Sequence, residues 1–107
     1  MRILAIGDIV GENAVDYTVR KLPLIKKEYS VDFVIANGEN SAVGNGITMN
    51  IARELTKAGV DVITLGNHTF TKKDVVNVLL NNSSVIRPVN YPEKTVGMGY
   101  VIKEKNG

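Results

Sequence analysis

Residues 60–68 read VDVITLGNH, an apolar run that ends in a glycine followed by two polar side chains. The same pattern occurs as RILAIGD at residues 2–8 and as VDFVIANGEN at residues 31–40. Short apolar runs of this kind predict strands of a parallel sheet, and the run at 31–36, which is almost wholly apolar after Asp32, is typical of a strand buried on both faces. Ligands of an open parallel sheet bind beyond the carboxyl ends of its strands. The three polar segments are therefore expected to meet at one site.

Helical patterns separate these apolar runs. The predicted strands cover about 3–6, 31–36, 60–65 and 99–103, and the predicted helices cover about 14–29, 48–58 and a stretch that begins near 71. The resulting order, β-α-β-α-β-α-β, predicts an α/β fold with right-handed crossovers. Pro23 is expected to kink or divide the first helix, because proline lacks an N–H group. Thr71 and Asp74 are expected to form a capping box at the start of the third helix.

Size and composition favour one small globular domain, here a single partial domain over residues 1–107. The net charge is only +2, and the lysines and arginines form no basic block, so no DNA-binding surface is predicted. No apolar run is long enough to span a membrane, and a cytoplasmic location is the default expectation. The chain has no cysteine, which excludes disulfides and thiolate metal sites.

The last residues have a strand-like pattern that runs into Asn106-Gly107. Asn-Gly is typical of a two-residue hairpin turn, because both residues tolerate a positive φ. A hairpin needs a returning strand, so the sequence favours a chain that has been cut within a hairpin. A frayed tail that happens to end in Asn-Gly is the alternative.

Five polar residues at the predicted strand ends have side chains suited to metal or phosphate chemistry: Asp8, Glu39, Asn40, Asn67 and His68. Two carboxylates in one crevice repel each other unless a cation lies between them. A pair of divalent ions can hold a phosphate and activate a water. Manganese, iron and zinc accept mixed oxygen and imidazole ligands, whereas magnesium prefers oxygen alone.

Each of these residues also has a simpler interpretation. Asp8 can cap a helix, the Glu39 segment can be a solvated turn, and a lone histidine is usually structural. The loop at 7–11 lacks the glycine spacing and the lysine of nucleotide-binding loops. Asp32 and Asp61 stand at strand starts, on the opposite edge, where a structural role is expected. The alternative to an enzyme is a non-catalytic α/β module that binds a phosphate or a nucleotide.

Three motifs together resemble one family. They are GDIVG at 7–11, NGEN at 37–40 and GNHT at 66–69, and RPVNYP at 87–92 and GMGY at 97–100 fit in order and spacing. The chain resembles the YmdB-type branch of the calcineurin-like metallophosphoesterases over essentially its whole length. The resemblance implies a partial calcineurin-like fold, namely half of an αββα sandwich.

The resemblance also implies an activity and a role for each motif residue. The activity is that of a two-metal phosphodiesterase for cyclic nucleotides, including 2′,3′-cyclic ones. Asp8 would bind the first metal, Glu39 would bridge both metals and Asn67 would bind the second. Asn40 would lie in or next to the ligand set. His68 would stand near the substrate phosphate, as a proton donor or a stabiliser of charge.

The chain departs from the family pattern in two ways. It has Phe70-Thr71 where the family often has Trp-Asp, and it has a single histidine, whereas the later half of the family's chains supplies several histidine ligands. The resemblance therefore identifies the chain as the N-terminal half of such an enzyme, with little or no activity alone. Half of the fold would leave a sheet face and an edge exposed, which favours a homo-oligomer or a strand-exchanged dimer.

Overall fold

The computed structural model describes residues 1–105, and the Asn106-Gly107 hairpin signal lies outside these residues. A four-stranded parallel sheet with strand order β1-β2-β3-β4 alternates with three helices. The elements are β1 (Ile3–Asp8), α1 (Gly11–Tyr29), β2 (Phe33–Asn37), α2 (Met49–Ala58), β3 (Val62–Thr64), α3 (Val75–Asn81) and β4 (Val85–Ile86). The predicted β-α-β-α-β-α-β order is confirmed.

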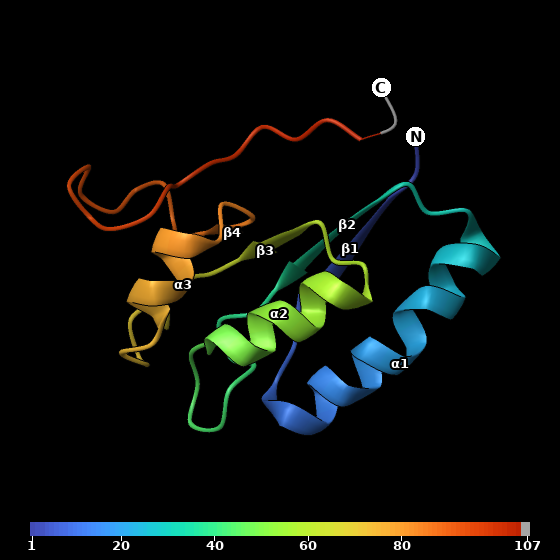
Figure 1. Ribbon diagram of the computed structural model, residues 1–107, viewed down its shortest axis with the longest axis horizontal. Helices are drawn as coiled ribbons and strands as arrows, with labels where there is room; N and C mark the ends of the chain where they lie inside the picture. The colour runs from blue at the N-terminus through green and yellow to red at the C-terminus, as the bar shows by residue number, and fades with distance from the viewer. Residues whose placement is uncertain (106–107) are drawn as a thin grey trace.

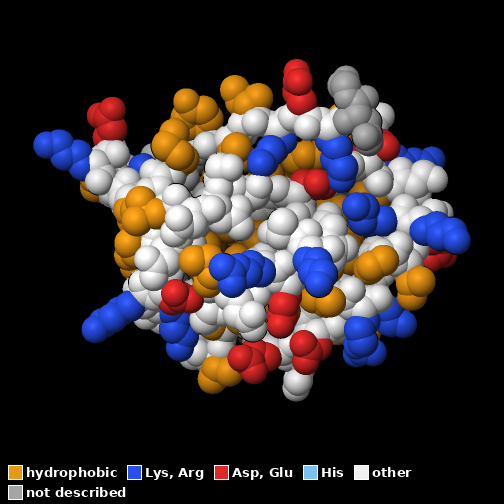
Figure 2. All heavy atoms as spheres, viewed as in Figure 1, with side chains coloured by type: hydrophobic (Ala, Val, Ile, Leu, Met, Phe, Trp, Pro, Cys, Tyr) orange, Lys and Arg blue, Asp and Glu red, His pale blue; other side chains and the backbone are white. Residues whose placement is uncertain are grey.

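All three helices cover the same face of the sheet (Figure 1). Right-handed crossovers between strands that are added in sequence order require this arrangement. Apolar side chains of β2 and β3 fill the space under the helices, where Val34, Ala36 and Ile63 are fully buried. Leu22 of α1 and Leu55 of α2 complete the same core. Figure 2 shows the outer side of this layer, where acidic and basic side chains are interspersed.

The prediction that the second strand is buried on both faces is wrong. In β2, buried Val34 and Ala36 alternate with half-buried Phe33 and Ile35. Their neighbour Ile3 in β1 is 59% exposed. The second face of β1 and β2 is open because every crossover helix lies on the first, whereas Val62 of β3, which pairs with Ile35, is buried.

Two predictions about helices need correction. Pro23 does not divide α1, which is continuous from Gly11 to Tyr29, and a kink at Pro23 stays a prediction. The proline is exposed, and the buried residues Val15 and Leu22 hold the helix on its other face. The capping box at the third helix does not form either, because Asp74 has another partner. Its Oδ2 accepts a hydrogen bond from the backbone N–H of Met49, at the start of α2, over 2.7 Å.

The predicted strand over residues 99–103 is absent from the described part of the chain, and Val85–Ile86 is the fourth strand instead. The segment runs as irregular chain back past the amino ends of the strands (Figure 1). Its side chains attach it there: Lys103 Nζ donates to Ser84 Oγ over 2.7 Å, and Lys105 Nζ lies 2.9 Å from Asp61 Oδ1. Side-chain anchoring thus replaces the strand pairing that its β-branched residues suggested.

Candidate functional site

A β-bulge at the end of β1 places Asp8. Ile6 pairs with Ala36, yet Asp8 pairs with Asn37, so two residues of β1 oppose one residue of β2. Simple alternation would put Asp8 on the same face as Ile6, under the helices. A bulge re-aims the side chain that follows it. The exposed Asp8 carboxylate accepts hydrogen bonds from Asn40 Nδ2 at both oxygens, each over 2.9 Å.

The loop after β2 holds Glu39 through its own hydrogen bonds. Asn37 Oδ1 accepts from the Glu39 backbone N–H over 3.0 Å, and Ser41 Oγ donates to the Gly38 carbonyl over 2.6 Å. The backbone N–H of Gly46 donates to the carbonyl oxygen of Glu39. These bonds close the loop around Glu39, so its side chain leaves the backbone in a defined direction.

The turn after β3 meets the Glu39 side chain. Glu39 Oε2 accepts a hydrogen bond from the backbone N–H of His68 over 3.0 Å. A Cβ atom at Gly66 would collide with both carboxylate oxygens of Glu39. Glycine at this position therefore leaves room for the Glu39 carboxylate, which a larger residue would displace.

The structure thus brings the predicted site residues to the carboxyl edge of the sheet in two linked pairs, Asp8 with Asn40 and Glu39 with His68. The backbone also joins the first two strand ends, since Gly11 N–H donates to the Asn40 carbonyl over 3.0 Å. Asn67 lies in the same turn as His68, with an exposed side chain.

The assembled residues do not make a complete metal site. Within residues 1–105, no group of three histidine, cysteine, aspartate or glutamate side chains is arranged to hold a metal ion. Among the described residues, the groups that donate hydrogen bonds to the Asp8 and Glu39 carboxylates are neutral amides. Two carboxylates without a cationic side chain beside them are chemically suited to a divalent cation. The single ion pair of the described residues, Lys105 with Asp61, lies at the opposite edge.

Sequence reasoning missed two residues of this edge. Asn37 Nδ2 lies 3.4 Å from Glu39 Oε1, and its Oδ1 binds the Glu39 backbone, so Asn37 orients Glu39 twice. Its position two residues before Glu39 is the signal of an Asx turn. Tyr91 donates its hydroxyl to the Gly66 carbonyl over 3.0 Å. This contact spans 25 residues, and no local pattern points to it.

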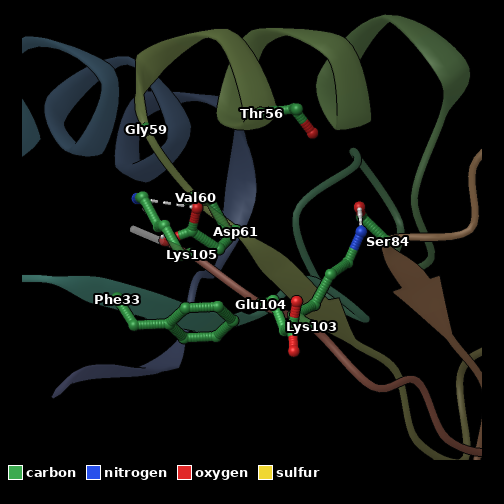
Figure 3. A pocket seen from close by; sticks show the side chains of 9 residues that line it. All are labelled: Phe33, Thr56, Gly59, Val60, Asp61, Ser84, Lys103, Glu104 and Lys105. Atoms are coloured by element: carbon green, nitrogen blue, oxygen red, sulfur yellow. Dashed lines mark hydrogen bonds and ion pairs between the residues drawn. The ribbon is translucent and has the colours of Figure 1, made fainter. Parts of the chain in front are cut away.

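The hollow shown in Figure 3 is a different feature, at the amino edge of the sheet. Its volume is about 330 Å³, and it lies between the starts of the strands and the chain end that carries Lys103, Glu104 and Lys105. Asp61 on its wall accepts from the Val34 N–H over 2.8 Å as well as from Lys105. This confirms the expected structural role of Asp61 and separates the hollow from the carboxyl-edge residues.

A parallel sheet with one layer of helices and a carboxyl-edge cluster of acidic and amide side chains is typical of α/β proteins that bind a ligand beyond the strand ends. The YmdB-like protein family matches residues 4–107, and the chain belongs to this family. No helix of the described residues is long and apolar enough to cross a membrane.

Similar proteins of known sequence and similar solved structures support the assignment to this family. The chain is 42% identical over 107 residues to the 2',3'-cyclic-nucleotide 2'-phosphodiesterase of Bacillus subtilis, covering 100% of this chain and 40% of that protein. A structure from Thermus thermophilus, titled as a hypothetical protein, matches with a TM-score of 0.91 and 43% identity over 100% of this chain and 41% of that one. A novel phosphatase from Mycoplasma pneumoniae matches with a TM-score of 0.86 and 33% identity, over 97% and 38% of the two chains. The chain therefore spans about two fifths of the length of these relatives.

Proposed function

We propose that the carboxyl edge of this sheet is one wall of a metal-dependent phosphodiesterase site. One observation carries the proposal: Asp8 and Glu39 meet at one edge, and the groups that donate to their carboxylates are neutral. Two such carboxylates suit a divalent cation, because a cation offsets their mutual repulsion. Membership of the YmdB-like family supports the same interpretation.

The metal ligands in this proposal are Asp8, Glu39 and Asn67, with Asn40 orienting Asp8. These three ligands are oxygen donors, and the resemblance implies histidine ligands from the later half of the family's chains; that combined set would suit two ions of manganese, iron or zinc rather than magnesium. When bound, such ions would polarise the phosphate and lower the pKa of a coordinated water. Asn37 and the His68 backbone N–H would keep the Glu39 carboxylate oriented.

His68 is the proposed catalytic residue. Its backbone is fixed by the bond to Glu39, and its side chain is partly exposed at the same edge. An imidazole in this position can give a proton to the leaving oxygen of a phosphodiester, or stabilise the charge that develops there. The substrate class we propose is a cyclic nucleotide, including a 2′,3′-cyclic one, as in the name of the Bacillus subtilis relative.

The 107 residues alone are expected to hydrolyse phosphodiesters poorly or not at all. The described residues supply too few ligands for two metals, and the longer relatives have about three fifths of their length outside the match. We therefore propose that this chain corresponds to the N-terminal half of a phosphoesterase domain. A cytoplasmic location stays a prediction.

The test combines an activity assay with metal titration. A chromogenic phosphodiester with added Mn²⁺ should give no more than trace turnover with this chain, and full activity would contradict the incomplete-site proposal. Mn²⁺ titration followed by paramagnetic broadening of amide signals should affect residues around Asp8 and Glu39 first. A phosphate-binding module would instead show phosphate-dependent shifts that D8A and E39A leave unchanged.

The bare face of the sheet also leads to a proposal about assembly. Ile3 and Ala5 of β1 are exposed, and Phe33 and Ile35 of β2 are half-buried next to them. An apolar sheet face of this kind favours burial against another chain. We propose that the isolated chain forms a homo-oligomer or a strand-exchanged dimer. A monodisperse monomer in light scattering at micromolar concentration would contradict this.

A further inference from the structure

The RPVNYP motif at residues 87–92 reaches the candidate site through one side chain. Tyr91 donates its hydroxyl to the Gly66 carbonyl over 3.0 Å. Its ring stacks on Phe70, with centroids 6.1 Å apart and an angle of 25° between the planes. Tyr91 therefore contacts both ends of the turn that contains Asn67 and His68.

The Gly66 carbonyl is the point at which this turn is fixed. It accepts hydrogen bonds from the Thr69 backbone N–H over 3.1 Å, from Thr69 Oγ1 over 2.5 Å and from the Tyr91 hydroxyl. Thr69 is fully buried, so its two bonds are local and shielded from water. Of these three hydrogen bonds, the one from Tyr91 comes from outside the turn, and it links the turn to a separate segment of the chain.

The segment that carries Tyr91 is itself held rigidly. Arg87 is 7% exposed, and its guanidinium donates to the carbonyls of Val96, Pro88 and Thr95. Its backbone N–H donates to the Met98 carbonyl over 3.0 Å. A buried arginine whose donors are bound to backbone carbonyls closes the 87–98 loop on itself. The closed loop therefore holds Tyr91 in place. A side chain that positions other groups must itself be held by a rigid segment.

The opposite side of the same turn holds Glu39. The His68 N–H donates to Glu39 Oε2, and the Glu39 carboxylate packs on the Cα of Gly66. A rotation of the peptide after Gly66 would move Asn67 and His68 directly and would alter the bond to Glu39. A change in the orientation of the Gly66 carbonyl, which Tyr91 holds, would therefore affect Asn67, His68 and Glu39.

We infer that Tyr91 is a positioning residue, which fixes the turn 66–68 so that Asn67, His68 and Glu39 face a common metal and phosphate site. The metal part of this inference rests on the proposed function. Tyr91 does not contact the reacting atoms in this role. It acts through the Gly66 carbonyl, and the loop closed by Arg87 supports it.

The test compares Y91F with wild type in the 107-residue chain. Y91F removes the hydroxyl and leaves the ring that stacks on Phe70. Y100F is the matched control, because Tyr100 lies in the following segment and is 62% exposed. Hydrogen exchange of the His68 amide, the chemical shifts of Asn67 and His68, and Mn²⁺ affinity from paramagnetic broadening are measured for each variant.

We expect Y91F to raise the local exchange rate of the His68 amide about fivefold, as expected for the loss of one hydrogen bond. Mn²⁺ affinity should fall about three- to tenfold, and Y100F should match wild type in both measurements. Y91F with unchanged His68 exchange and shifts would overturn the inference. So would an exchange rate that rises equally throughout the protein, because that result means a global loss of stability.

This design tests the proposed metal site and the positioning role of Tyr91 separately. Wild-type chain that shows no Mn²⁺-dependent broadening near Asp8 and Glu39 would count against the proposed metal site. The exchange and shifts of His68 would still decide whether Tyr91 orients the turn.

Discussion

The two edges of the sheet both carry acidic residues, yet the fold uses them differently. At the amino edge, Asp61 accepts from the Val34 N–H and from Lys105, and Asp32 accepts from the Arg2 N–H over 2.7 Å. At the carboxyl edge, Asp8 accepts from a neutral amide, and its side chain is exposed. Acidic groups link segments at both edges, but Asp61 at the amino edge pairs with the cationic Lys105, whereas Asp8 and Glu39 accept from neutral amides among the described residues. Similar residues thus serve structure at one edge and a proposed site at the other.

The largest expected effect is on metal binding at the carboxyl edge. D8A and E39A should each lower Mn²⁺ affinity by more than about 100-fold, because removing a mere supporting residue of a metal site already costs about 10–100-fold. Paramagnetic broadening of amide signals measures the affinity. D32A is the control from the amino edge and should leave the Mn²⁺ effect intact. If D32A and D8A lost the same amount of Mn²⁺ affinity, the carboxyl edge would not be the specific metal site.

The next effect concerns the contact between the ends of β2 and β3. G66A should lower the free energy of unfolding by about 1–3 kcal/mol, because the new methyl group must displace the Glu39 carboxylate. Urea denaturation measures this change. Gly7 is the matched control, since a Cβ there meets no atom within 4 Å. G7A should stay within about 0.5 kcal/mol of wild type. A G66A protein as stable as wild type would show that the packing is not tight.

A smaller effect is expected from the amino edge. D61A should destabilise the fold by about 1–2 kcal/mol, because the Val34 N–H loses its acceptor at the start of β2. Thermal unfolding and the Mn²⁺ titration should be measured on the same sample. Because Asp61 lies at the amino edge, away from the proposed metal site, D61A should have lower stability and unchanged Mn²⁺ affinity. A parallel loss of metal affinity would mean that the edges are coupled.

The smallest effect should come from the ion pair itself. K105A should cost less than about 1 kcal/mol, because both side chains are partly exposed to solvent. The difference from wild type should shrink as salt is added, since salt screens exposed charges. Unfolding in low and high salt measures it. If K105A lowered the free energy of unfolding by a large amount that did not depend on salt, Lys105 would stabilise the fold by more than its ion pair with Asp61.

Much of the carboxyl edge was predictable from local sequence. An apolar run, a glycine and a polar pair recur at residues 2–8, 31–40 and 60–68, and the parallel order of the strands brings their ends together. Asp61 was also predictable as structural, because its place at a strand start puts it at the opposite edge. Periodicity and strand direction suffice for both results.

Two failed predictions, the capping box and the strand over residues 99–103, have a common cause in distant contacts. The Asp74 carboxylate binds the start of α2, 25 residues away, and so forms no capping box. The chain after Gly99 is held by Lys103 and Lys105 rather than by strand pairing. The bulge at Gly7 changes the face of Asp8; a glycine inside a strand often marks a bulge, but the register of the pairing with β2 decides where Asp8 points. Each of these features depends on which partner the folded chain brings near.

Local periodicity and short motifs were enough to establish the α/β class, the family and the identity of the polar residues at the strand ends. The orientation of those residues depends instead on the folded chain. Asn40 holds Asp8, Asn37 and the His68 backbone hold Glu39, and Tyr91 holds the turn at Gly66. Folding also leaves the second face of β1 and β2 open, since every crossover helix packs on the first. Hydrogen bonds between distant segments form only after the strands have packed, so no local pattern contains them.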